Sequence, residues 1–455
     1  MARRSLDSDK QCYSILMFCR LSIKGASGIK PCIKCSNILM KNSGLADRHV
    51  DLLEIDCTDR NKFISQSDQD VWRHYDQLGA MKGHTTVANF EMHQKAMGIT
   101  WSEHGILGDG DLRAHMLPVS SLTFDWQHTF LSNGIVSQEI WQFFAACRSV
   151  GMKDVWQLLN RYCQADWSFP HQHQTAGRSI HKMFNATREK ASTDHLKCGA
   201  SELLTAYPLI RRFSESVVAA RFAVQLQNEL ASLRLCCKVL DMLQDAKGGP
   251  CDTGALHLAM QSYLDAHKTA YGTESWKPKF HFGLHVPEQI ERDRRLYDCF
   301  VVERSHQLPK FVAQAVKNTE GFEKSVLARA LLHRLQALQA WNERPGLRGN
   351  TQFSNELNVT LAANAYVSGM NVSAGDLLFA MGYMMSLAAV VERNGDFGLL
   401  GYTCDVVRRS TSSCAIYRMN SSLSLLWLED RVRRAHGWST DAAGELVVLL
   451  PDLLP

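Results

Sequence analysis

Two different hydrophobic patterns divide this chain, and they constrain its fold more than any other feature of the sequence. Up to about residue 340, apolar residues recur every three or four positions, which is the spacing of amphipathic helices. After Asn350, apolar and polar residues alternate in stretches rich in β-branched side chains, which is the pattern of strands. The sequence therefore predicts an α+β protein that is mainly α-helical with minor β structure.

Turn residues and polar stretches set the predicted element boundaries. The predicted helices cover 67–97 with a break near Gly83, 135–162 as one or two helices, 201–244 up to a stop at 248–250, 254–271 and 308–340. The predicted strands cover 13–20, 387–407, 413–428 and 446–450. We interpret residues 164–198, the least hydrophobic stretch, as a mobile loop. At roughly 100–200 residues per domain, we expect an N-terminal part (1–60), a helical region (61–345) and a small β-rich C-terminal domain (346–455).

Composition excludes several classes of protein. Lys and Arg exceed Asp and Glu by 50 to 46, and this net charge of +4 does not by itself indicate a nucleic-acid partner. No apolar run approaches the length of a membrane span, and the first residues lack the apolar segment of a signal peptide. We therefore expect a nuclear or cytoplasmic protein, neither secreted nor membrane-spanning, whose 14 cysteines are reduced.

The motif Cys32-Ile-Lys-Cys35 is the sharpest local signal in the chain. Two thiolates three positions apart on a tight turn can occupy adjacent corners of a zinc tetrahedron. The nearest candidates for the remaining ligands are His49 and Cys57. We predict a structural Zn²⁺ site with these four residues; a thiol redox pair and an inert turn are the alternatives.

A second short motif, Asp125-Trp-Gln-His128, ends an apolar run. In a helix, its acid and imidazole share one face, where the acid can hold a divalent metal and the histidine can orient a phosphate. The alternative is an aspartate that caps a helix N-terminus.

His281 and His285 lie four residues apart, as the two histidines of a metalloprotease helix do. Phe282 stands where such a helix has its general-base glutamate, and Gly283 and Pro287 disfavour a helix. We therefore do not predict a protease site here.

Several basic residues are candidates for phosphate contacts. Arg292, Arg294 and Arg295 form a short cluster that is either a solvated face or a phosphate-binding one. Glu303, flanked by Arg304, His306 and Lys310, is either a salt-bridge partner or a metal-binding acid beside cations that hold a phosphodiester. The chain has no GxxxxGK, GxGxxG or GxSxG motif, so the commonest nucleotide-handling and hydrolase classes are excluded.

The order of these motifs resembles a known family. Five blocks occur in this order along the chain: Gly25-Ala-Ser-Gly28 with Cys32-x-x-Cys35; Leu117-Pro-Val to Asp125-x-x-His128; His281-x-x-x-His285-x-Pro-Glu288; Phe300-Val-x-Glu303-Arg304 with Lys310; and Asn318 to Glu323. This order resembles the catalytic region of cut-and-paste DNA transposases of the CACTA (En/Spm) type, in particular the divergent copies of dinoflagellate genomes. The resemblance covers residues 24–330.

The resemblance implies an RNase H-like core with a large helical insertion, at about 136–275, before a return to the core at about 276–340. In the family, two Asp and one Glu hold two divalent metals, such as Mg²⁺, for phosphodiester chemistry. Cys32 and Cys35 match the family's CxxC, and Asp125 and His128 match its Asp-x-x-His. Glu303 is the match to the late acid, with Glu202 as the alternative.

The chain departs from the family where the first two catalytic aspartates should lie, upstream of the CxxC. Only about 30 residues precede Cys32, and Asp7 and Asp9 have no strand context. We therefore expect an N-terminally truncated, transposase-derived protein that retains DNA affinity and lacks catalysis. A homo-oligomer is a further candidate assembly, and Mg²⁺ is expected only with a complete site. The rival hypothesis is a zinc-stabilised helical interaction protein without a DNA role. A third is a metal nuclease using Asp125, His128 and Glu303 alone.

Overall fold

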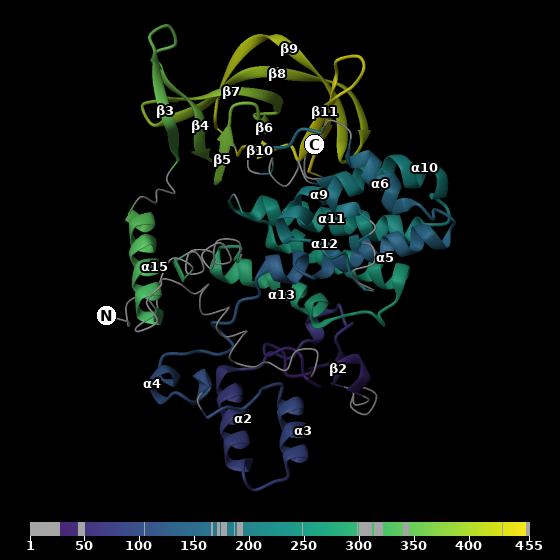
Figure 1. Ribbon diagram of the computed structural model, residues 1–455, viewed down its shortest axis with the longest axis vertical. Coiled ribbons are helices and arrows are strands. Elements are labelled where there is room, and N and C mark those ends of the chain that lie inside the picture. The colour runs from purple at the N-terminus through teal and green to yellow at the C-terminus, as the bar shows by residue number, and fades with distance from the viewer. Residues whose placement is uncertain are drawn as a thin grey trace. The chain divides into compact units, whose positions relative to one another are not determined.

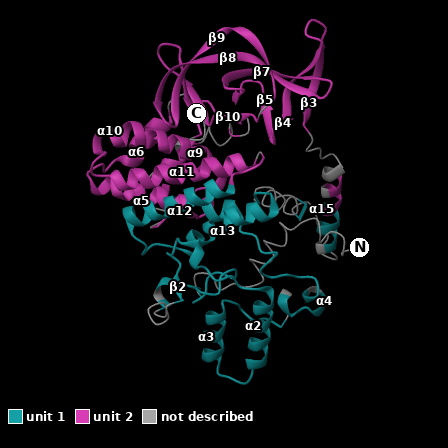
Figure 2. Ribbon diagram, turned by 180° about the vertical axis from the view of Figure 1, so that it is seen from behind, with its two compact units in different colours: residues 1–130, 253–330 teal, residues 131–252, 331–455 magenta. Residues whose placement is uncertain are grey.

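The computed structural model divides the chain into two compact units, each built from two stretches of sequence. Unit 1 contains residues 1–130 and 253–330, and unit 2 contains residues 131–252 and 331–455 (Figure 2). The described residues are 28–43, 51–103, 105–164, 167–170, 173, 180–185, 187–188, 194–247, 249–297, 299, 312–313, 322–339, 345–429 and 431–451.

The described part of unit 1 is mainly helical. Its strands, β1 (Ile38–Leu39) and β2 (Leu53–Glu54), pair in parallel. Its helices are α2 (Asp68–Met81), α3 (Val87–Met97), α4 (Gly110–Arg113), α12 (Thr253–Tyr271) and α13 (Pro278–Asp293), with 3-10 turns at Lys41–Ser43, Arg60–Lys62 and Ile106–Gly108 (Figure 1). A capping box starts α2: the Ser67 hydroxyl accepts from the Asp70 backbone N–H at 3.2 Å, and the Asp70 carboxylate accepts from the Ser67 N–H at 2.9 Å.

Polar side chains fasten the described N-terminal part of unit 1, residues 28–43 and 51–66, to the region of α12. The Thr58 hydroxyl donates to Asp265 Oδ1 at 2.7 Å, and Lys41 Nζ lies 2.7 Å from Glu274 Oε1. Within the segment, Asn37 Nδ2 donates to the carbonyls of Asp51 and Lys62 at 3.0 and 2.9 Å. Chain segments about 200 residues apart in sequence, such as those of Thr58 and Asp265, are thus held side by side.

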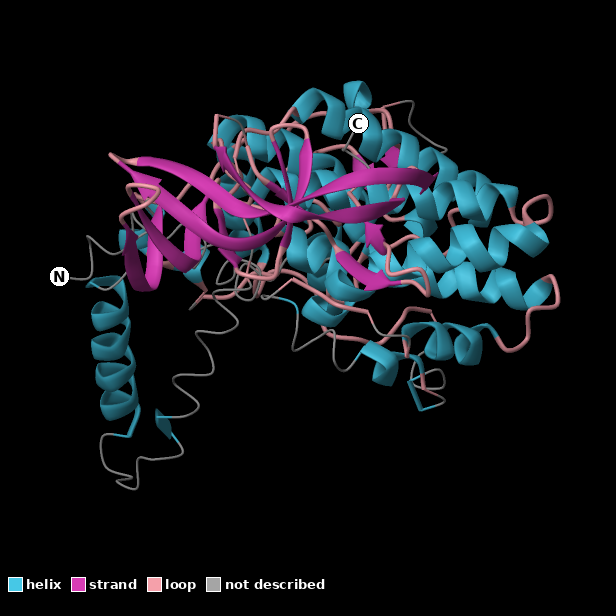
Figure 3. Cartoon of the chain, turned by 90° about the horizontal axis from the view of Figure 1, so that it is seen from above, coloured by secondary structure: helices cyan, strands magenta, loops and turns pink. Residues whose placement is uncertain are grey.

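Unit 2 combines a helical layer with a large sheet (Figures 2 and 3). Its helices are α5 (Ile135–Ser149), α6 (Val155–Cys163), α9 (Ala200–Phe213), α10 (Ala219–Phe222) and α11 (Gln227–Lys247), with a 3-10 turn at Ile180–Phe184 and a π-turn at Ser214–Val218. Helix α15 (Phe322–Gln339) crosses the division between the two units at Ala330.

A buried ion pair joins α9, α11 and the C-terminal region of unit 2. Arg211 Nη1 lies 2.6 Å from Asp241 Oδ2, and the two side chains are 2% and 0% exposed. Arg211 Nη2 also donates to the Leu450 carbonyl at 2.8 Å, and Asp241 Oδ1 accepts from the Tyr207 hydroxyl at 2.6 Å. Both buried charges therefore have hydrogen-bonding partners, as buried charges require.

The sheet of unit 2 is antiparallel throughout, with order β10-β6-β7-β8-β9-β12-β11, while β4 joins β7, β3 and β5. Its strands are β3 (Gly346–Ser354), β4 (Val359–Val367), β5 (Met370–Ser373), β6 (Leu377–Ala380), β7 (Tyr383–Arg393), β8 (Asp396–Thr411), β9 (Cys414–Trp427), β10 (Arg433–Arg434), β11 (Gly437–Thr440) and β12 (Leu446–Leu449). Val390 of β7 and Leu399 of β8 are directly paired and fully buried, and they belong to one of its apolar cores.

Two-residue turns ending in glycine connect several of these strands. Between β7 and β8, Asn394 and Gly395 have φ values of 57° and 92°, which is the left-handed conformation that type I′ hairpin turns require at both positions. Ser368-Gly369 and Met381-Gly382 repeat this conformation between β4 and β5 and between β6 and β7. These turns explain why long strands follow one another with so few residues between them.

The α+β prediction is confirmed. The predicted break in the helix of 67–97 falls between α2 and α3, where Gly83 has a φ of 82°. The predicted strands near 387–407, 413–428 and 446–450 correspond to β7 and β8, β9 and β12. The strand predicted at 13–20 lies outside the described residues, as do parts of the loop predicted at 164–198 and of the helix predicted at 308–340.

Candidate metal centre

The Cys32–Cys35 motif forms a tight, buried turn in unit 1. The side chains of Cys32 and Cys35 are 1% and 2% exposed. Backbone hydrogen bonds hold the turn against residues 64–66: Ser36 N donates to the Ile64 carbonyl and Gln66 N donates to the Lys34 carbonyl, each at 2.8 Å. Both sulfur atoms are therefore fixed by backbone structure, as metal-binding thiols on a knuckle need to be.

Helix α13 supplies the imidazoles of His281 and His285 to the same place. Residues four apart lie on one helix face, and both side chains are buried, His281 at 0% and His285 at 6% exposed. The expectation that Gly283 and Pro287 would prevent a helix is wrong, because α13 continues through both. The burial of Phe280, Leu284, Val286 and Ile290 outweighs the unfavourable propensity of two residues.

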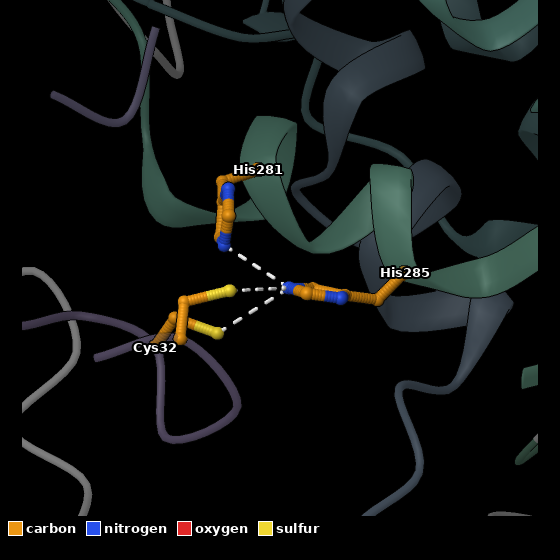
Figure 4. A group of neighbouring side chains, drawn as sticks. Cys32, His281 and His285 are labelled. Atoms are coloured by element: carbon orange, nitrogen blue, oxygen red, sulfur yellow. Dashed lines mark hydrogen bonds between the residues drawn. The ribbon is translucent and has the colours of Figure 1, made fainter. Parts of the chain in front are cut away.

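The four donor atoms converge. His285 Nε2 lies 3.5 Å from Cys32 Sγ, 3.3 Å from Cys35 Sγ and 3.1 Å from His281 Nε2 (Figure 4). All four donor atoms lie within 4.8 Å of one another. In a tetrahedral site with Zn–S near 2.3 Å and Zn–N near 2.0–2.1 Å, the S···N and N···N separations are about 3.3–3.6 Å. The measured separations fit such a tetrahedron to within a few tenths of an ångström, so this buried Cys2His2 group could hold a metal such as zinc.

Aromatic rings enclose the group. Phe63 approaches His281 edge-on with ring centroids 4.9 Å apart, and Phe124 stacks on His285 with centroids 5.4 Å apart. Phe282, which stands where a protease has its glutamate, stacks on Phe124 with ring centroids 4.5 Å apart. An apolar shell excludes water and strengthens electrostatic interactions inside it.

The ionisation of the thiols suits metal binding. Burial by itself raises the pKa of Cys32, but its hydrogen bond with Cys35 and the neighbouring imidazoles of His285 and His281 bring this pKa well below its usual range. The hydrogen bond to Cys32 and burial raise the pKa of Cys35. One sulfur of the pair thus favours the thiolate form, which is the form that binds metal.

The structure pairs Cys32 and Cys35 with His281 and His285, whose spacing indicates a protease-like pair and a block of the transposase resemblance but which are not among the predicted zinc ligands. The predicted ligand Cys57 is not in this group; its thiol faces the Asp59 carbonyl, 3.8 Å away. His49 lies outside the described residues. The spacing C-x2-C followed by H-x3-H was the available signal, because it is the spacing of Cys2His2 zinc sites.

Asp125 and His128 adjoin Cys299 in unit 1, and their donor atoms form a second convergent group. The Asp125 carboxylate accepts from the backbone N–H groups of Gln127 at 3.1 Å, His128 at 2.9 Å and Cys299 at 3.0 Å. It also contacts His128 Nδ1. Asp125 therefore caps the π-turn at Gln127–Leu131 and pins residue 299, which is the capping arrangement that the sequence left open.

The remaining predicted acids lie elsewhere. Glu202 belongs to unit 2, where its carboxylate accepts from the Gly199 N–H at 2.8 Å and pairs with Arg188 at 3.0 Å. Burial raises the pKa of Glu202, but Arg188 and the Gly199 N–H lower it by more, so the pKa lies below its usual range. Glu303, Arg304, His306 and Lys310 lie outside the described residues.

The predicted basic cluster lies at the C-terminal end of α13. Arg292 pairs with Asp293, its Nη2 2.7 Å from the carboxylate. Arg294 ends the helix in the left-handed conformation, with a φ of 53°, and Arg295 follows it; all three arginines are exposed. Their side chains are accessible to solvent, which both the solvated-face and the phosphate interpretations require.

Comparisons with protein-family models, curated proteins and solved structures gave no match to this chain. Among the described helices, we find none with the length and apolar character needed to cross a membrane.

Proposed function

We propose that unit 1 is a zinc-stabilised module whose metal is bound by Cys32, Cys35, His281 and His285. The observation that carries this proposal is the convergence of four buried donor atoms from segments 250 residues apart, as Cys35 and His285 are. Two thiolates and two imidazoles in a tetrahedral arrangement are the donor set that favours Zn²⁺ over harder cations. The Nε2 atoms of both histidines lie together beside the thiols, as ligands of one metal would.

The role of the metal is structural. Four protein ligands fill the coordination sphere and leave no position for water or substrate, as in closed zinc sites. Once bound, zinc cross-links the two segments and contributes its binding free energy to folding. Side-chain contacts position the ligands: Thr58, Lys41 and Asn37 hold the N-terminal segment in place, and α13 carries the two imidazoles.

The test is metal content and stability of the full chain. We expect a single Zn²⁺ per chain by elemental analysis, and a lower Tm after chelation. Cys35→Ser and His285→Asn should lose the metal, whereas Cys57→Ser should keep it, since its thiol is outside the group. Retention of zinc by both site variants, or loss of zinc from Cys57→Ser, would overturn the proposal. A native chain that binds no zinc after incubation with Zn²⁺ would overturn it as well.

We further propose, as a second candidate function, descent from the catalytic region of a CACTA-type DNA transposase, with a partial RNase H-like core. The observation in favour is spatial. Three blocks on which the resemblance rests meet in unit 1, because Phe124, which precedes Asp125, stacks on His285, and His285 contacts Cys32 and Cys35. Blocks far apart in sequence are expected to meet if they serve one site.

This second proposal includes the loss of catalysis. Asp125, the acid of the matched Asp-x-x-His motif, already accepts from three backbone N–H groups. We expect Mg²⁺-dependent strand cleavage to be absent. We expect DNA binding to remain, through exposed cations such as Arg294 and Arg295. The expected location is the nucleus or the cytoplasm. Fluorescence anisotropy with duplex DNA at several salt concentrations tests binding, since phosphate contacts weaken as salt rises. Absence of binding at low salt would contradict the proposal.

A further inference from the structure

The outward face of His285 carries a charged contact that the metal site alone does not require. If His285 binds metal through Nε2, its proton lies on Nδ1. This Nδ1 lies 3.5 Å from Glu288 Oε2, three residues further along α13, and Glu288 Oε1 lies 3.0 Å from Arg60 Nη2. Arg60 begins the 3-10 turn Arg60–Lys62, in the N-terminal segment that also carries the cysteines. The same two segments thus meet twice, at the thiols and at this ion pair.

The contact acts on the imidazole in a defined way. A carboxylate that accepts the N–H of a metal-binding histidine fixes its tautomer and ring orientation, and makes the ligating nitrogen more basic. Glu288 is suited to this role because Arg60 Nη2 holds one of its carboxylate oxygens at 3.0 Å, which leaves the other oxygen facing His285 Nδ1.

His281 differs from His285 in this respect. Its side chain is 0% exposed, and its Nδ1 has no hydrogen-bonding partner among the described residues. The two imidazoles are thus not equivalent ligands, since among the described residues a carboxylate contacts the Nδ1 atom of His285 but none contacts that of His281.

We propose that Glu288, held by Arg60, is the positioning residue of the metal site: it fixes the Nε2-donating form of His285 and so makes His285 the anchoring imidazole. This inference rests on the proposed zinc site. Glu288 itself contacts neither the proposed metal position nor a thiol. The side chain of Glu288 is 47% exposed and that of Arg60 is 35% exposed. An ion pair this accessible adds little to folding stability by itself, so its removal should affect metal affinity far more than the metal-free fold.

The experiment compares zinc affinities, measured by competition with a chromophoric chelator, in the full-length native chain and its variants. Glu288→Gln keeps the size of the side chain and removes its charge, and Arg60→Met removes the partner. Glu291→Gln is the matched control, since Glu291 lies exposed on the same helix. We expect Glu288→Gln to bind zinc about 10- to 100-fold more weakly than native, which is the usual effect of losing such an outer contact, and Arg60→Met to lose affinity less.

The outcomes separate the two proposals. Weaker binding in Glu288→Gln with native affinity in Glu291→Gln, at unchanged stoichiometry and unchanged stability of the metal-free chain, supports the inference. Native affinity in both Glu288→Gln and Arg60→Met overturns it and leaves the zinc site intact. A native chain that takes up no zinc overturns the site and the inference together. Should Glu288→Gln fail to fold, Arg60→Met still decides the question.

Discussion

The ring of Phe124 lies nearly parallel to the imidazole of His285, with centroids 5.4 Å apart and an angle of 21° between the planes. Because Phe124 is followed by Asp125, this stacking places the capped turn at 125–128 against one of the proposed metal ligands. A single aromatic side chain therefore joins two of the motifs found in the sequence.

Replacing Phe124 should destabilise unit 1. The side chain is 2% exposed and stacks on both His285 and Phe282, so Phe124→Ala removes buried area and leaves a cavity. We expect a loss of about 3–5 kcal/mol in the free energy of unfolding, measured by urea denaturation of zinc-loaded protein. Phe353→Ala serves as the control, because Phe353 is 56% exposed. Equal effects of the two substitutions would contradict this picture.

The capping role of Asp125 makes a separate prediction. Asp125→Ala leaves the backbone N–H groups of Gln127, His128 and Cys299 without their acceptor, at a cost of about 1–3 kcal/mol. Asp125→Asn retains an acceptor oxygen and should cost less. Zinc content should be native in both variants, since Asp125 is not in the Cys2His2 group. Thermal denaturation with elemental analysis checks both points, and loss of zinc from Asp125→Asn would count against the assignment.

The buried ion pair of unit 2 should be costly to break. Arg211→Met removes the guanidinium beside the Asp241 carboxylate, which is 0% exposed, while Tyr207 and His436 remain next to it. Breaking a buried ion pair by removing one partner typically costs about 3–5 kcal/mol. Arg418 also pairs with an acid, Glu445 at 2.6 Å, but its side chain is 70% exposed. We expect Arg418→Met to cost about 0–1 kcal/mol. Denaturant titration of the two variants measures their losses in the free energy of unfolding. Similar losses would show that burial does not determine the cost of breaking an ion pair in this protein.

Acid should weaken unit 1 through His267. This side chain is 0% exposed and accepts a hydrogen bond from Trp276 Nε1 at 3.0 Å, and burial lowers its pKa from 6.5 to about 3. Because the unfolded chain takes up the proton first, the stability contributed by neutral His267 is complete above pH 6.5 and declines as the pH falls toward 3.

The measurement is the free energy of unfolding against pH for native protein and His267→Gln, both with metal removed. Glutamine keeps an acceptor for Trp276 but does not titrate in this range. The native protein should show a steeper decline between these pH values, by up to about 1.4 kcal/mol per pH unit. Parallel curves would mean that His267 is not neutral in the folded chain.

Local patterns in the sequence predicted the local structure well. The helical spacing over 67–97 predicts α2 and α3, Gly83 separates them, and the strand predicted over 387–407 corresponds to the paired strands β7 and β8. Each of these signals acts over a few residues, through side-chain period or backbone freedom. For such features, sequence and structure agree because the cause is itself local.

The proposed metal site depends on contacts between distant segments, which local patterns do not predict. The C-x-x-C spacing predicts Cys32 and Cys35 as a ligand pair, but no signal within a short window of sequence joins them to histidines 250 residues away. Sequence proximity favoured Cys57 instead. Pro287 and Gly283 argued against a helix at His285 on propensity, whereas the burial of the surrounding apolar residues keeps α13 intact. Long-range packing, which no window of sequence contains, decides both questions.

The distance in sequence between the two ligand pairs sets an order of events during synthesis. At about 5–20 residues per second, the ribosome needs on the order of ten to fifty seconds to proceed from Cys35 to His285, 250 residues later. Throughout that interval the cysteines are outside or near the ribosome without their histidines, while all of the first stretch of unit 2 is being made. Unit 1 therefore closes after translation of residues 131–252, and the proposed zinc cross-link forms only after that point.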